Sequence, residues 1–218
     1  MTDEPRIFRY VVRYDSGNAP NPYGGYCTLA ICKPVIRRTA KPGDWVIGFH
    51  RFHGQHGARH EEICYVMQVC ECLPYATYWE DPRFRSRRPT NEKKSMPISD
   101  FAPPDDNIYQ PVGAGIDGES QLVQVRDNDA GHDKPDAQQT DKRGKYVLVS
   151  KRFWYFGGDA KMIPVHLSHL GKVGRGHVVH KYREKTDVHY LEAWLNDITP
   201  GRVGEPRLLK SRLAFGNR

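Results

Sequence analysis

The sequence feature that most restricts the possible fold is a series of strand-forming runs without regular helices between them. Residues 7–14 alternate apolar and polar side chains, and residues 62–72 form the longest run of β-branched and aromatic types. Further runs of this kind are residues 26–33, 45–49, 146–150 and 153–156. Alternation and β-branched composition are typical of strands. Because strands and helices do not alternate, the pattern favours an α+β fold: a curved mixed or antiparallel sheet, or a small β-barrel, flanked by short helices and long loops.

Apolar and aromatic residues recur at the spacing of a helix in two segments of the chain. Tyr75, Tyr78 and Trp79 predict a short helix within residues 74–84, and Leu191, Trp194 and Leu195 predict another within residues 189–196. Residues 85–144 are rich in proline and polar side chains, and only residues 121–125 look like a strand there. We therefore expect residues 85–144 to be largely loop.

The length of 218 residues favours a single domain over residues 1–218, since two full cores would need a longer chain. No apolar stretch approaches the roughly 20 residues that a bilayer requires, and the first residues lack the layout of a signal peptide. Five cysteines occur without paired CxxC spacing, which fits a reducing compartment. The sequence thus predicts a cytoplasmic protein with no membrane partner.

A net charge of +7 makes polyanions the natural class of partner, because Lys and Arg that neutralise phosphates release counterions. Many basic proteins nevertheless bind no polyanion. The side chains expected to contact a nucleic-acid backbone are Arg37, Arg38, Arg51, Arg85, Arg87 and Arg88. Nearby aromatic residues of the predicted helix either stack on bases or anchor that helix in the core.

Neither a metal nor a cofactor is expected. His50, His53, His56, His60 and Cys64 form a group with metal-ligand chemistry, but their spacing is not that of a structural zinc site and interleaved arginines would repel a dication. Residues 113–118 satisfy the GxGxxG string, yet they lack the preceding strand and following helix of a dinucleotide site.

The densest chemical segment is the loop of residues 14–27, where a carboxylate, amides, hydroxyls and a thiol lie between two predicted strands. Asp15, Asn21, Tyr26 and Cys27 are expected to line one cavity that holds an extruded base, since Asp and Asn read base edges and tyrosines stack. The alternative is a connector rich in Asx-turns that binds nothing.

Several segments resemble the second class of nucleotide modification associated domains. They are RYD at residues 13–15, APNPYGGYCTLA at 19–30, CKP at 32–34 and IRR at 36–38, followed in order by GDWVIG at 43–48, YWEDPRF at 78–84, RP at 88–89, DNIY at 106–109, and residues 147–157. The resemblance covers most of residues 7–160. It leaves residues 161–218 as a C-terminal extension of unmatched role, and the family carries a smaller residue where Phe49 and His50 stand.

This resemblance implies a domain encoded beside enzymes that hypermodify DNA bases in bacteria and phages, including systems that place 7-deazaguanines in DNA. The partners implied are DNA with a modified base and other proteins of the modification system. The base-binding residues would be Asn21, Tyr23, Tyr26, Trp45, Asn107 and Tyr109. The turn before Trp45 is also similar to PUA-like folds such as EVE domains, so an RNA-binding PUA-like module is a further alternative.

Two classes of function remain open. A reader would hold the modified base and need no catalyst. An enzyme would hydrate the nitrile of a cyano-deazaguanine in DNA to the amide without a metal, using Asp15 as a general base, or a thiolate of Cys27 or Cys32 activated by Lys33. Alternation along a regular strand sends residues 27 and 32 to opposite faces, and cysteine in an apolar strand is more often a core residue. The catalytic residues predicted are Asp15, Cys27 and Lys33.

Overall fold

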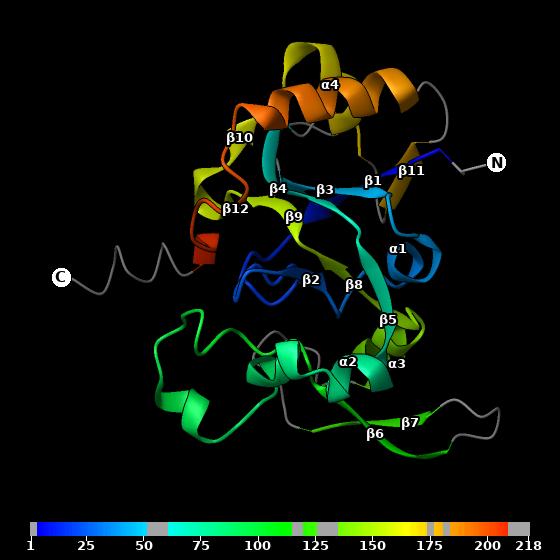
Figure 1. Ribbon diagram of the computed structural model, residues 1–218, viewed down its shortest axis with the longest axis vertical. Helices are drawn as coiled ribbons and strands as arrows, with labels where there is room; N and C mark the ends of the chain where they lie inside the picture. Colours follow the sequence, from blue (N-terminus) through cyan, green and yellow to red (C-terminus); the bar gives the residue numbers. More distant parts are fainter. Residues whose placement is uncertain are drawn as a thin grey trace.

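The computed structural model describes residues 4–51, 61–114, 120–125, 135–173, 177–180 and 184–208. Its largest sheet is mixed, with the strand order β11-β1-β3-β4-β9-β12 and with β10 paired to β4 (Figure 1). The pairs β1–β3 and β9–β12 are parallel and the others antiparallel. The strands are β1 (Ile7–Val12), β3 (Trp45–His50), β4 (Glu62–Gln68), β9 (Arg152–Tyr155), β10 (Lys161–Met162), β11 (His177–His180) and β12 (Gly201–Arg202).

A second sheet is antiparallel and has the order β2-β8-β5, from β2 (Cys27–Leu29), β8 (Tyr146–Ser150) and β5 (Glu71–Pro74). The predicted run of residues 62–72 is two strands, because the chain leaves the main sheet after β4 and enters the second sheet at β5. A hairpin of β6 (Tyr109–Ala114) and β7 (Ser120–Gln124) stands apart. Among the residues that the structure describes, the sheets do not close into a barrel, so the predicted α+β fold with mixed and antiparallel sheets is confirmed and its barrel alternative is wrong.

The helices are short. They are α1 (Pro34–Thr39), α2 (Tyr75–Glu80), α3 (Pro135–Lys142), α4 (Glu184–Asn196) and the 3-10 helices η1 (Pro82–Arg87), η2 (Glu92–Ser95), η3 (Gly157–Asp159) and η4 (Val165–Gly171). The two predicted helices are confirmed as α2 and α4. The run of residues 26–33 was expected to be strand throughout, but β2 ends at Leu29 and Pro34 starts a helix, where its missing N–H costs nothing.

Within residues 85–144, which were expected to be largely loop, the structure has the end of η1, and also η2, the β6–β7 hairpin and α3. Pro111 is tolerated in β6 because this strand belongs to a two-stranded ribbon and has one open edge. Helix α3 carries mostly polar side chains, so its sequence lacks the apolar stripe that would predict a helix. The strand expected at residues 121–125 is confirmed as β7.

Both faces of the main sheet are buried. Phe8 and Tyr10 of β1 pack toward the second sheet, whereas Ile7 packs on the opposite face with Leu191 and Leu195 of α4. Helices α4 and η4 lie over that opposite face (Figure 1). The C-terminal residues that the resemblance left without a role therefore supply three strands of the main sheet and one layer of the core.

Candidate functional site

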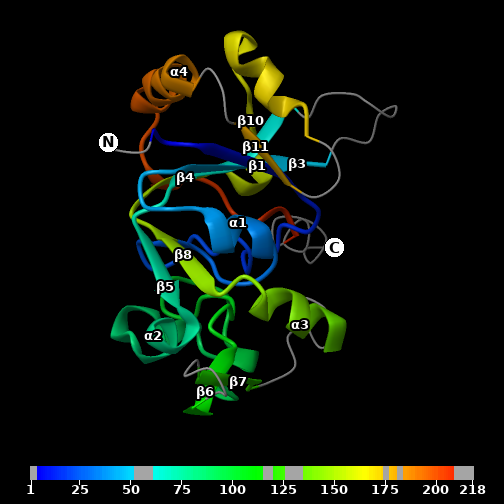
Figure 2. The same ribbon diagram turned by 90° about the vertical axis from the view of Figure 1, so that its right-hand side faces the viewer.

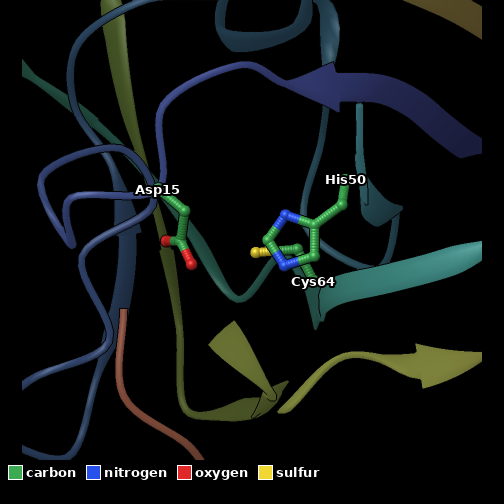
Figure 3. Close-up of side chains that lie close together, drawn as sticks. All are labelled: Asp15, His50 and Cys64. Carbon is green, nitrogen blue, oxygen red and sulfur yellow. The ribbon is translucent and has the colours of Figure 1, made fainter. Parts of the chain in front are cut away.

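Three side chains with acid–base and metal-ligating chemistry converge at one edge of the main sheet. Asp15, His50 and Cys64 each offer a ligand atom, and these atoms lie within 4.8 Å of one another (Figure 3). His50 ends β3 and pairs with Val12 at the end of the parallel strand β1, and Asp15 follows shortly after. Cys64 comes from the adjacent β4. The carboxyl ends of β1 and β3 thus bring Asp15 and His50 together.

The Asp15 carboxylate is 4% exposed and is held from two sides. Its Oδ1 accepts a hydrogen bond from the Tyr155 hydroxyl, and its Oδ2 accepts one from the backbone N–H of Arg207 at 2.8 Å. Burial, and then the charge of Asp15, raise the pKa of Tyr155 well above its usual value. Tyr155 therefore stays protonated and donates, which fixes the orientation of the carboxylate.

The His50 ring is oriented by a backbone carbonyl. Its Nε2 lies 2.7 Å from the carbonyl oxygen of Gly157. Because a carbonyl can only accept, Nε2 donates its proton in this contact, and Nδ1 is the ring nitrogen that remains as a possible ligand. Gly157 has φ 53°, and a Cβ there would lie 2.1 Å from the carbonyl oxygen of Glu205. Only glycine fits this position, so the backbone that orients His50 is closely determined.

The Cys64 thiol is fully buried in the core between the two sheets. Burial raises its pKa well above the usual value, and the neighbouring Asp15 raises it further through its charge and by accepting a hydrogen bond from the thiol. As it stands, the cluster combines a carboxylate, an imidazole and a protonated thiol. Sequence reasoning grouped His50 and Cys64 with His53, His56 and His60, which lie outside the described residues, and did not connect them with Asp15.

The other two predicted catalytic residues have different surroundings. Cys27 is fully buried in the same core, and desolvation raises its pKa, so its thiol is a poor nucleophile. Lys33 has a left-handed backbone with φ 45°, and its Nζ lies 4.5 Å from the centre of the Tyr10 ring. Desolvation lowers the Lys33 pKa. Cys32 also has a positive φ of 59°, so strand alternation does not relate it to Cys27.

Most of the predicted base-binding residues are buried and use their polar atoms within the protein. Asn21 Nδ2 donates to the Pro104 carbonyl at 2.8 Å, Asn107 Nδ2 to the Tyr78 carbonyl at 3.1 Å, and the Tyr109 hydroxyl to Asp141 at 3.0 Å. Trp45 stacks on Trp154 in the core, and the Tyr23 hydroxyl donates to Glu205. Of these six residues only Tyr26 is partly exposed. The loop of residues 14–27 is thus packed against its neighbours rather than folded around an open cavity.

Arg87 holds the loop of residues 14–27 in place through hydrogen bonds. It is 2% exposed, and its guanidinium donates to the carbonyls of Tyr23 and Tyr26 and to the Thr28 hydroxyl. It also lies 3.4 Å from the buried carboxylate of Asp106. The expectation that Arg87 contacts a nucleic-acid backbone is corrected, because every such contact would require this buried group to leave its partners.

Arg37 is corrected for the same reason. It is fully buried and donates to the carbonyls of Cys32, Tyr146 and Asp141 and to the Tyr75 hydroxyl. A Cβ on Gly144 would lie 2.3 Å from the Arg37 guanidinium carbon, so glycine is needed for this close approach. Arg37 therefore fastens the end of α3 to α1.

The remaining predicted backbone contacts lie at the surface or close to it. Arg38, Arg51 and Arg85 are exposed, and Arg88 is half-buried with its guanidinium carbon 4.2 Å from the centre of the Trp79 ring. Arg38 belongs to a group of basic side chains around α1 and α3, which lie side by side (Figure 2). We call this group the α1/α3 basic face: Arg13, Lys33, Arg38, Lys142 and Arg143.

Two observations each link a pair of residues in the α1/α3 basic face. Arg38 donates to the Arg143 carbonyl at 3.3 Å, and the Arg13 charge adds to the lowering of the Lys33 pKa. Sequence reasoning missed Arg13, Lys142 and Arg143 in this role, although the KRGK run at residues 142–145 is a visible basic signal.

Comparison with known proteins finds one family. The family described as nucleotide modification associated domain 2 matches residues 4–213. No curated protein and no solved structure matches the chain. In the described part of the chain, none of the helices combines the length and the apolar character needed to cross a bilayer.

Proposed function

The chain belongs to the nucleotide modification associated domain 2 family, and on this premise we propose that it is the DNA-binding component of a base hypermodification system that holds a modified base of the 7-deazaguanine type. Membership of this family indicates that the chain is associated with nucleotide modification. The kind of nucleic acid, the base and the partner proteins of the system are parts of the proposal.

The observation that carries the proposal is the α1/α3 basic face. Arg38 lies in α1 and Lys142 in α3, whereas Lys33 precedes α1, Arg143 follows α3 and Arg13 follows β1. The buried Arg37 joins α1 to the end of α3. Basic side chains grouped on adjoining helices suit the phosphates of a duplex, and each contact releases counterions. The exposed Arg51 and Arg85 extend the set of basic side chains beyond this face.

A second candidate, hydration of a nitrile on the base, is favoured by the convergence of Asp15, His50 and Cys64. In this reaction a water oxygen bonds to the nitrile carbon and one π bond to nitrogen breaks, one water proton reaches the nitrile nitrogen through the general base, and the second follows when the imidic acid tautomerises to the amide. Asp15 or His50 would deprotonate the water. The route through a Cys27 thiolate loses support, because that thiol is buried with a raised pKa.

Salt-dependent binding tests the proposal. Binding of a fluorescent duplex is measured by anisotropy across a range of salt concentrations, for the unchanged chain and for the double variant Arg38→Ala with Arg143→Ala. Each lost phosphate contact lowers the slope of log K against log salt by about 0.9, so a fall of about 1.8 is expected. Lys161 and Lys172 are exposed lysines outside this face, and their double alanine variant is the control.

The same assay compares a duplex carrying a 7-deazaguanine-type base with one carrying guanine. Tighter binding of the modified duplex supports the assignment of the base. If both double variants keep the slope of the unchanged chain, the α1/α3 basic face is not the DNA-binding surface. Mass spectrometry of nucleosides after incubation then separates a reader, which leaves the base unchanged, from a hydratase, which adds the mass of water.

A further inference from the structure

We infer that Asp15, His50 and Cys64 bind one divalent transition-metal ion of the zinc class. This goes beyond the proposed function and does not depend on it, since the ion would occupy the cluster whether or not the protein binds DNA. The expectation from the sequence that no metal is present considered His50 and Cys64 without Asp15, which only the fold brings to them.

The spacing of the three donor atoms is close to that of a tetrahedral site. Zinc is bound by thiolate sulfur at about 2.3 Å and by histidine nitrogen or carboxylate oxygen at about 2.0–2.2 Å. In a tetrahedron these lengths separate the donor atoms by roughly 3.3–3.6 Å. One ligand atom from each side chain lies within 4.8 Å of the other two, and side-chain rotations that shorten these separations would close the site around an ion, with Nδ1 as the His50 ligand because Nε2 contacts the Gly157 carbonyl.

The charges of the donor set also match such an ion. All three side chains are buried, with exposures of 4% for Asp15, 4% for His50 and 0% for Cys64. A thiolate and a carboxylate together carry two negative charges, and a divalent ion neutralises them where solvent cannot. One sulfur, one nitrogen and one oxygen donor suit zinc or cobalt, whereas magnesium and calcium prefer oxygen donors alone.

The groups around the donors hold them as metal ligands are usually held. His50 donates through Nε2 to the Gly157 carbonyl at 2.7 Å, and Asp15 accepts hydrogen bonds from Tyr155 and from the Arg207 backbone. Metal-binding histidines typically donate their second ring N–H to a carbonyl or carboxylate, and ligating carboxylates are themselves hydrogen-bonded. Each carboxylate oxygen keeps a second lone pair for the ion.

Three protein donors leave one tetrahedral position for water or a substrate atom. This number of ligands is found in catalytic zinc sites, whereas structural sites use four protein ligands. The ligand class implied for the fourth position is therefore a small oxygen or nitrogen donor.

The experiment uses the full chain after treatment with a chelator and titrates it with Zn²⁺ by calorimetry and with Co²⁺ by absorption spectroscopy. We expect one equivalent of either metal to bind, and the cobalt form to show tetrahedral visible bands with a thiolate-to-cobalt charge-transfer band. X-ray absorption at the zinc edge should show one sulfur neighbour. These measurements need no variant and so do not depend on whether a variant folds.

Variants then assign the donors. Cys64→Ser should remove the charge-transfer band, and His50→Ala or Asp15→Asn should weaken Zn²⁺ binding at least tenfold, whereas Cys70→Ser at an exposed thiol should change nothing. A triple alanine variant of His53, His56 and His60 tests the neighbouring histidines. The inference is overturned if the unchanged chain binds no stoichiometric metal, if zinc has no sulfur neighbour, or if the triple variant loses binding while Cys64→Ser keeps it.

Discussion

Replacing Arg37 by methionine should destabilise the protein strongly, whereas the same change at the adjacent Arg38 should not. The sequence presents the two arginines alike, and both were expected to contact phosphates. The structure separates them, because Arg38 is exposed and Arg37 is fully buried. The Arg37 guanidinium donates to four acceptors, which are the Cys32, Asp141 and Tyr146 carbonyls and the Tyr75 hydroxyl.

The size of the effect follows from these acceptors. Methionine fills much of the volume of Arg37 but donates no hydrogen bond, and each buried acceptor left without a donor costs about 1–3 kcal/mol. The contributions of the four neutral acceptors are not additive, so we expect a total loss of about 3–5 kcal/mol. For a chain of this size that lowers the Tm by roughly 6–20 °C.

Urea unfolding followed by circular dichroism measures this loss as a shift of the midpoint at constant slope. Arg38→Met is the matched control, since it removes the same charge from the next position. It should change the free energy of unfolding by no more than about 0.5 kcal/mol and lower the salt slope of DNA binding by about 0.9. Equal stabilities of the two variants would refute the buried role of Arg37.

Three further predictions concern other parts of the molecule. Hydrogen bonds from Arg83 lower the pKa of Glu71, so this contact stabilises the fold above the usual carboxyl pKa and is lost as pH falls through the lowered value. Because both side chains are about one third exposed and solvent screens the pair, Arg83→Gln should cost less than about 1 kcal/mol at neutral pH and nothing near pH 2. Urea unfolding at both pH values measures this difference. Leu191→Ala should lower the free energy of unfolding by about 2–5 kcal/mol, because it leaves a cavity under α4. His189→Ala, at an exposed position of the same helix, should change it by no more than about 0.5 kcal/mol. If thermal unfolding shows equal effects for the two variants, α4 does not belong to the core. Asp15→Asn should remove the gain of water by the modified nucleoside while leaving the anisotropy of the bound duplex unchanged, because the variant loses the carboxylate base but keeps the α1/α3 basic face; a folded variant with unchanged nucleoside masses would move the base elsewhere.

Local patterns in the sequence were enough for the class of fold. Alternation in residues 7–14 predicted β1, and aromatic spacing at Tyr75, Tyr78 and Trp79 predicted α2. These signals work because the periods of strands and helices are properties of neighbouring residues. The prediction was wrong where apolar residues show little periodicity, as in the polar helix α3 and in the proline-containing strand β6.

The candidate site depends on contacts that no local pattern encodes. The motif resemblance drew attention to Asp15, but His50 and Cys64 reach it only because β1 lies beside β3 and β3 beside β4. Strand order is decided by which faces bury the most apolar surface across the whole chain, including α4, and so it cannot be read from any one segment.

The sequence by itself therefore determined where β1, β3, β4, β7, β8 and β9 lie, two of the helices, the basic charge and the family, but it missed β6, β10, β11 and β12. The tertiary structure decided which polar residues are functional candidates and which hold the fold together. Arg37 and Arg38 are the same residue type at adjacent positions, but the Arg37 side chain points into the core and the Arg38 side chain points into solvent. Because both are charged, the first holds the fold together and the second is a candidate for binding phosphate. In water an arginine is free to bind a phosphate, whereas a buried one must satisfy its donors within the protein.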